Sequence, residues 1–179
     1  MLFRSSQADL EKQFQLLSEV REQLNRVYDA VNQIQDVREQ LSGIKKRLGP
    51  ADSYKGLLDA ASGLDAKLVS VRDPLINVRI SANEDSLAYP PGLDVRLAFL
   101  AMSVTGASDS APTESQNQLF DQLKKQTDES LARWEQVRST DIAGFQKLAA
   151  DQAVHAIQVP DGKSERVQGG SRGAELDED

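Results

Sequence analysis

Residues 10–48 read LEKQFQLLSEVREQLNRVYDAVNQIQDVREQLSGIKKRL, a stretch of almost forty residues without a proline. Apolar side chains recur in it at steps of mostly three or four residues, namely Leu10, Phe14, Leu17, Val20, Leu24, Val27, Val31, Ile34, Val37, Leu41, Ile44 and Leu48. This spacing places them on one face of a helix, about 58 Å long at about 1.5 Å per residue. Such a helix needs a partner of comparable length to cover its stripe. The stretch therefore predicts a helical architecture and says little about chemistry.

Polar residues mark both ends of this predicted helix. Ser5 or Ser6 can cap its first turn, where Asp9 also suits the helix dipole. Gly49-Pro50 follows the last apolar residue, in the usual order for a helix end. We therefore expect the helix to begin at Ser6 or the residue after it, and to end before Gly49.

Two shorter helices are predicted in the middle of the chain. The first can begin at Asp52 or Ser53 and has an apolar stripe from Leu57 to Val78, within which Pro74 removes a backbone hydrogen bond. A kink or a break is therefore expected near residues 70–74. The second follows consecutive prolines and is predicted from Pro91 to Val104, because a helix can begin at the second proline.

A second long helix is predicted after a short polar loop. Pro112 suits a first turn, and Thr113 with Gln116 has the spacing of a capping box. The apolar stripe of this helix comprises Leu119 or Phe120, Leu123, Leu131, Trp134, Val137, Ile142, Phe145 and Leu148. Its length matches that of the first helix, so the two are expected to cover one another.

Together these elements predict an all-α fold, an up-and-down four-helix bundle with two long helices, one proline-kinked helix and one short helix. Residues 6–159 form the expected bundle domain. Residues 160–179 are rich in glycine, poor in apolar side chains and acidic. They are expected to be a disordered acidic tail.

Composition excludes several classes of function. The chain of 179 residues has a formal net charge of -7, which argues against binding a nucleic-acid backbone or an anionic membrane. It has no cysteine, so disulfides, thiolate nucleophiles and cysteine-based zinc sites are excluded. No stretch is apolar for long enough to predict a membrane span, and residues 1–7 do not resemble a signal peptide.

The sequence offers no catalytic, cofactor-binding or metal-binding motif. His155 is the single histidine, and no Glu-x-x-His pair is present, which argues against a ferritin-like metal site. Asp94 and Asp141 come closest to the apolar setting that an acid–base carboxylate needs, but a cap or a salt bridge is the favoured interpretation of each. We therefore expect no catalytic residue, no cofactor and no metal.

Several polar and aromatic side chains allow two interpretations. Trp134 is expected to be a core anchor whose N–H reaches a polar partner, and the alternative is a platform for stacking a sugar. The same alternatives hold for Tyr28 and Tyr89. A further group lies on or beside the first stripe, where its members either fix helix register or form a half-exposed flank, namely Asn32, Gln33 and Gln40.

The order of several short segments resembles a known family. The segments are Val31-Asn32-Gln33-Ile34, Val37-Arg38-Glu39-Gln40-Leu41, Leu64-Asp65-Ala66-Lys67-Leu68, Asp85-Ser86-Leu87-Ala88-Tyr89-Pro90, Leu93 to Leu100, Ala111-Pro112-Thr113 and Thr140-Asp141-Ile142-Ala143-Gly144-Phe145. Over roughly residues 7–159, their order and spacing resemble the helical C-terminal region of large bacterial proteins with BNR/Asp-box repeats. Those proteins have a sortilin-like propeller and are often described as glycosyl hydrolases.

The resemblance implies a β-propeller upstream of this region, an exported and hence extracytoplasmic parent, and a non-catalytic role for the helices. The chain itself contains no Asp-box motif, so no catalytic residue is carried over. Pro74 and the pair Pro91-Gly92 depart from the family pattern, which affects the details of the two middle helices.

The leading functional hypothesis is therefore a C-terminal accessory or interaction domain of such a propeller protein, acting by bracing the propeller, docking a partner or forming a homo-oligomer. One alternative is a part of a carbohydrate-cleaving enzyme that contributes to its substrate site, which requires a pocket with two carboxylates and aromatic side chains. Another is a stand-alone helical adaptor or dimerisation module.

Overall fold

The computed structural model describes residues 6–77, 90–106, 110–154, 157 and 159, and among these it contains helices and turns but no strand. The all-α class expected from the sequence is confirmed for this part of the chain. The expected tail, His155 and Tyr89 lie outside the described residues. The elements in chain order are α1 (Gln7–Leu48), η1 (Asp52–Tyr54), α2 (Lys55–Leu75), α3 (Leu93–Gly106), α4 (Glu114–Gln136), η3 (Val137–Ile142) and α5 (Ala143–Asp151).

The long helices begin at the capping boxes that the sequence contains. At α1 the backbone N–H of Asp9 donates to Oγ of Ser6, and the carboxylate of Asp9 accepts from the backbone N–H of Ser6, each over 3.2 Å. At α4 the backbone N–H of Gln116 donates to the hydroxyl of Thr113 in the same way. α1 ends at Gly49, whose φ of 59° lies in the region that glycine adopts without strain.

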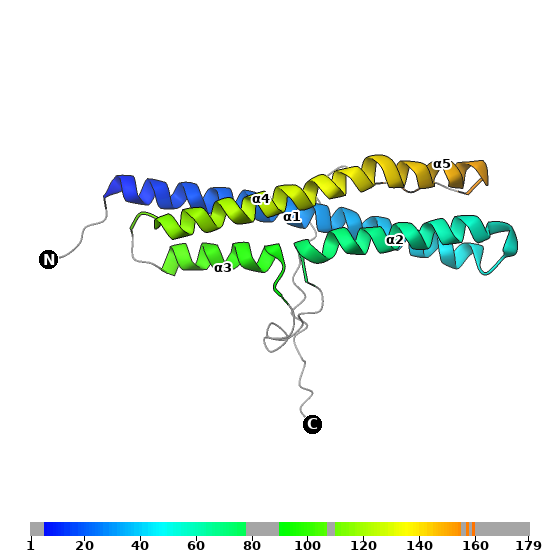
Figure 1. Ribbon diagram of the computed structural model, residues 1–179, viewed down its shortest axis with the longest axis horizontal. Helices are drawn as coiled ribbons and strands as arrows, with labels where there is room; N and C mark the ends of the chain where they lie inside the picture. Colours follow the sequence, from blue (N-terminus) through cyan, green and yellow to red (C-terminus); the bar gives the residue numbers. More distant parts are fainter. Residues whose placement is uncertain (1–5, 78–89, 107–109, 155–156, 158, 160–179) are drawn as a thin grey trace, which may run out of the picture.

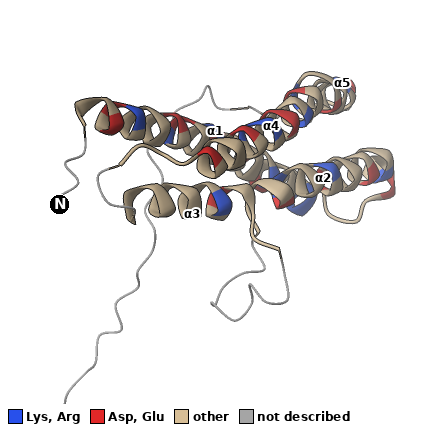
Figure 2. Ribbon diagram, turned by 60° about the vertical axis from the view of Figure 1, so that its left-hand side comes forward, with Lys and Arg blue, Asp and Glu red and all other residues tan. Residues whose placement is uncertain are grey.

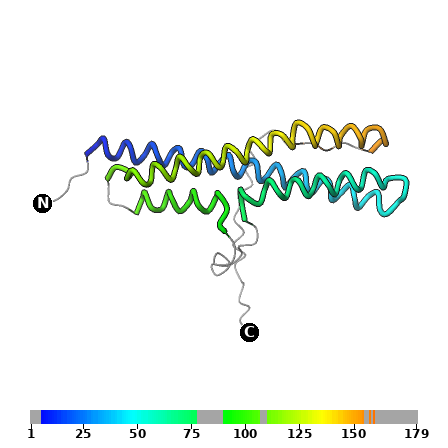
Figure 3. Tube along the Cα trace, in the orientation of Figure 1, coloured from blue at the N-terminus to red at the C-terminus, as the bar shows by residue number. Residues whose placement is uncertain are grey.

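Three rods of helix lie side by side along most of the molecule (Figures 1 and 3). α1 is one rod and contacts α2, α3 and α4. α2 and α3 follow one another along it and form the second rod, while α4, η3 and α5 run on as the third. α3 thus begins where α2 stops, and the two middle helices lie one after the other along α1.

The junction between α2 and α3 explains this arrangement. The side-chain amide of Asn77 donates to the carbonyl oxygen of Pro90 over 2.7 Å, so the chain returns to the place that it left. At about 1.5 Å per residue, the 21 residues of α2 and the 14 of α3 measure about 32 and 21 Å, against about 63 Å for the 42 residues of α1. Both helices are needed to cover α1.

The helix α2 ends beside Pro74. α2 ends at Leu75, one residue beyond Pro74, and the backbone N–H of Ile76 closes the last turn on the carbonyl of Arg72. The break predicted near residues 70–74 is therefore found one residue later, while Val78, the last residue of the predicted stripe, lies outside the described residues. α3 begins at Leu93 rather than Pro91, and it ends at Gly106 rather than Val104.

The buried face of α1 follows a strict alternation of four- and three-residue steps, through Leu16, Val20, Gln23, Val27, Ala30, Ile34, Val37, Leu41 and Ile44. Such a heptad spacing is the pattern of coiled-coil packing. The stripe predicted from the sequence was partly wrong. Leu10 and Phe14 are exposed, and four members expected in the core are only half-buried, namely Leu17, Leu24, Val31 and Leu48.

The third rod contains one irregular turn. The buried residues of α4 keep the heptad spacing as far as Val137, and the next buried residue is Ile142, five positions later. η3 between them is a π-helical turn, which accommodates the extra residue and returns Ile142 and Phe145 to the core. The predicted second long helix is thus continuous but changes its register at this turn.

Candidate functional site

Trp134 lies between α4 and α1 with only 2% of its surface exposed. Its indole N–H donates to Oε1 of Gln33 on α1 over 3.0 Å. The expectation of a core anchor with a polar partner is therefore confirmed, and so little exposed ring excludes the sugar platform. Gln33 is half-buried, and its bond to Trp134 favours the interpretation that it fixes the register between the two rods.

The two carboxylates singled out in the sequence lie in different surroundings. Asp141 in η3 forms an ion pair with Lys67 of α2, which confirms the salt-bridge interpretation. Asp94, in the first turn of α3, is buried, and its Oδ1 has no hydrogen-bond partner among the described residues. Burial raises the pKa of Asp94, although the backbone N–H of Val95 acts in the opposite direction. Burial and then the charge of Asp94 also raise the pKa of Tyr28 on α1.

Asp94→Asn is expected to stabilise the fold by about 1 kcal/mol at pH 7, because a buried carboxylate oxygen without a partner loses its hydration. Since the native pKa is raised above the ordinary value of 3.8, the folded protein binds the proton more readily than the unfolded chain. The contribution of Asp94 to stability therefore falls as pH rises from that value through the native pKa. The gain from Asp94→Asn should shrink on acidification, as measured by urea unfolding at several pH values. An equal gain at pH 3 and pH 7 would contradict this account.

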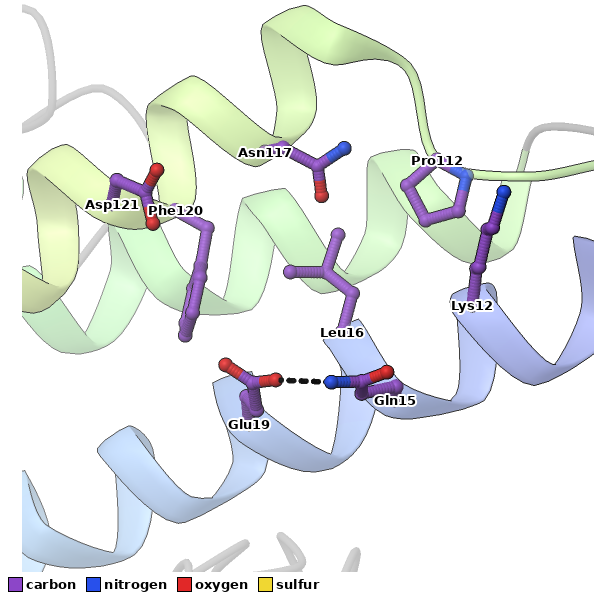
Figure 4. A pocket seen from close by; sticks show the side chains of 8 residues that line it. All are labelled: Lys12, Gln15, Leu16, Glu19, Pro112, Asn117, Phe120 and Asp121. Carbon is purple, nitrogen blue, oxygen red and sulfur yellow. Dashed lines mark hydrogen bonds between the residues drawn. The ribbon is translucent and has the colours of Figure 1, made fainter.

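A hollow of about 240 Å³ lies between the N-terminal part of α1 and the start of α4 (Figure 4). Its lining includes the carboxylates of Glu19 and Asp121, and Phe120 lies between them in the view. Two carboxylates beside an aromatic ring are what the carbohydrate-cleaving alternative requires. Phe120, however, is buried, so it offers no ring face on which a sugar could stack. The amide of Gln15 already donates to Glu19 over 3.2 Å.

Two further hollows lie along the seams between rods. One of about 470 Å³ lies between α1 and α4 near Trp134, and one of about 250 Å³ lies between α2 and α5. Ion pairs occupy the rims of both, namely Arg26–Asp128 and Arg138–Glu135 in the first and Lys67–Asp141 in the second. The side chains of these ion pairs are already bound to one another, so they are not available to bind a ligand in either hollow.

Exposed large apolar side chains gather at one end of the molecule. Every such side chain among the described residues comes from the first turns of α1, the second half of α3 or the first turns of α4, namely Leu10, Phe14, Phe99, Met102 and Leu119. We call these five residues the end surface. Phe14, Met102 and Phe99 are exposed by 73, 64 and 61%.

Hydrogen bonds hold the three contributing helices in register at this end. The amide of Gln13 on α1 donates to the carbonyl of Val104 on α3 over 2.9 Å, and the amide of Gln116 on α4 donates to the carbonyl of Ser103 over 3.1 Å. Phe14 follows Gln13 directly, and Met102 precedes Ser103. The end surface is therefore built on helices held in fixed register, and Figure 1 shows that α3, the start of α1 and the start of α4 lie at the same end of the molecule.

α3 carries two apolar stripes. The buried stripe consists of Leu93, Leu97, Leu100 and Val104. A second set with the same steps of four, three and four residues lies about half a turn away, and it consists of Val95, Phe99, Met102 and Gly106. We call this set the outer stripe. Residues 97–106 carry no charge, and Figure 2 shows α3 without acidic or basic colour over most of its length.

A helix that is apolar on all sides is typical of a protein interior, yet the rods cover only one face of α3. From the sequence α3 was predicted to have a single apolar face, a prediction that did not include Phe99 and Met102. The signal that identifies them is the repeated spacing of the outer stripe.

The described residues contain no group of acidic or histidine side chains arranged to hold a metal ion. No helix among them is long and apolar enough to cross a bilayer. The chain matches no protein-family model, no curated protein and no solved structure. The resemblance to propeller proteins therefore stays a prediction.

Proposed function

We propose that this protein is a non-catalytic helical interaction domain, and that the end surface is the part that binds. The observation that carries the proposal is the clustering of all five exposed large apolar side chains of the described residues on three helices at one end. Exposed apolar patches of a few hundred Å² mark interaction sites in soluble proteins. Core packing and ion pairs hold the helices together elsewhere in the described residues, which fits a rigid scaffold for such a surface.

We also propose that the helices form an up-and-down bundle in which α2 and α3 share one column. Heptad spacing on α1, α2 and α4 supports this, because it lets facing helices interlock along their whole length. The resemblance supports a further part of the proposal, namely that the domain follows a β-propeller in an exported parent protein. In that setting the helices brace or extend the propeller, and catalysis, where present, belongs to the propeller.

A photo-crosslinking experiment in the source cells tests the binding role. A photoreactive phenylalanine analogue at Phe14 is expected to give a covalent adduct with a polypeptide, because this side chain is the most exposed of the end surface. The same analogue at Ala66, which is exposed on α2 away from the end surface, is the matched control and should give none. Absence of any adduct from Phe14, or equal adducts from both positions, would contradict the proposal.

A further inference from the structure

We propose that the partner of the end surface is a second copy of this chain, and that the two α3 helices pack antiparallel through their outer stripes about a two-fold axis. This inference rests on the proposed binding role of the end surface and names its occupant. Three properties of α3 support a copy of the chain over another partner, namely the spacing of the stripe, its area and its lack of charge.

The spacing of the outer stripe is self-complementary. In an antiparallel pair related by a two-fold axis, residues face one another when their numbers add to a constant. With the axis between positions 99 and 102, Phe99 faces Met102 of the other copy, and Val95 faces Gly106. Each pair then joins a larger side chain to a smaller or more adaptable one, and a methionine sulfur packs well against an aromatic ring. A Cβ at Gly106 would meet no atom of its own chain within 4 Å, so this position is open.

The exposed area is sufficient for a small specific interface. Phe14, Phe99 and Met102 each expose more than half of a side chain of about 200 Å². With Leu10 and Leu119, the end surface amounts to about 500 Å², and two copies together would bury about 1,000 Å². That value is near the lower limit for a specific protein–protein interface. α1 and α4 both contact α3. In the proposed dimer their exposed residues extend the contact on either side of the helix pair.

Charge also favours this face over others for self-association. The chain carries a net charge of -7, so most faces of two copies repel one another. The outer stripe lies in residues 97–106 over most of its length, where no charged residue occurs. The nearest charged side chain that precedes this segment on α3, Arg96, donates to Oε1 of Gln126 on α4 over 2.7 Å and is therefore directed away from the stripe. In the proposed pairing it lies across from uncharged Thr105.

Sedimentation velocity of the full chain over a wide range of concentration tests the proposal. The wild type is expected to form a dimer, and Phe99→Lys and Met102→Glu are each expected to raise the dissociation constant at least 100-fold, roughly, because each buries a charge against an apolar side chain. An equimolar mixture of the two variants should regain the dimer, since the introduced charges face one another with opposite sign. Ala66→Glu and Met102→Leu are the controls and should dimerise as the wild type does.

Circular dichroism should give the same helix content for monomeric variants and controls, because positions 99 and 102 are exposed within one copy. A wild type that stays monomeric at every concentration overturns the inference, as does a mixture that does not regain the dimer. If the Phe14 crosslink joins a different polypeptide while the purified chain stays monomeric, the binding role stands and the second copy is not the partner. If the analogue at Phe14 gives no crosslink, the proposed binding role of the end surface is itself contradicted.

Discussion

Trp134→Ala is expected to lower the free energy of unfolding by about 3–5 kcal/mol, the range for removing a large aromatic side chain from a core. Trp134 is almost fully buried, and it lies one turn before the π-helical turn η3, where the third rod changes register. Its loss leaves a cavity between α4 and α1 and leaves the amide of Gln33 without its indole partner. The effect is measured by urea unfolding, with far-ultraviolet circular dichroism as the signal. This signal reports helix content and does not depend on the fluorescence of the indole that the substitution removes.

Two milder variants separate the cavity from the hydrogen bond. Trp134→Phe keeps an aromatic ring and removes the N–H, so a cost of about 1–2 kcal/mol is expected, and Gln33→Leu removes the acceptor. In a double-mutant cycle the two substitutions should be less than additive, because either one abolishes the same bond. Strict additivity would show that the bond contributes nothing, and a cost below about 1 kcal/mol for Trp134→Ala would contradict its assignment to the core.

The sequence predicts well those features that depend on neighbours along the chain. The capping box at Thr113 was identified from residue types three positions apart, and Ser5 or Ser6 was expected to cap the first helix. Both helices begin at a capping box in the structure, and the cap of the first is Ser6. The all-α class and the end of α2 beside Pro74 follow from local backbone chemistry in the same way. In each case the partners lie within one helical turn, so no tertiary contact is needed to predict them.

The features that were missed depend on which helix covers which face. Apolar spacing alone could not distinguish Leu16 from Leu17, because a covered face is set by the positions of two neighbouring rods. The π-helical turn is visible in the sequence as a five-residue step between the apolar residues Val137 and Ile142. A regular α-helix cannot place two residues at this spacing on one stripe. The spacing of the outer stripe of α3 is equally visible in the sequence, but only the structure shows that none of the described helices covers it.

The junction between α2 and α3 leads to the second large expected effect, a loss of about 2–3 kcal/mol for Gly92→Ala. A Cβ at Gly92 would lie 2.6 Å from Oδ1 of Asp94, 2.8 Å from the backbone nitrogen of Asn77 and 2.9 Å from Cα of Ile76. Two of these obstacles are backbone atoms, so a change of side-chain rotamer cannot relieve the clash. The chain must instead separate the end of α2 from the start of α3, which disturbs the column that covers α1.

Gly63→Ala is the matched control for this substitution. Gly63 lies inside α2, and a Cβ there would meet no atom within 4 Å, so alanine should stabilise the helix by about 0.5–1 kcal/mol through its higher propensity. Thermal and urea unfolding of the two variants should therefore shift in opposite directions, although the chemical change is identical. If Gly92→Ala proves as stable as the wild type, the close approach of α2 and α3 does not determine how the second rod is built. A shift of the expected sign and size shows that the absence of a side chain at Gly92 allows α2 and α3 to approach closely enough to form one rod.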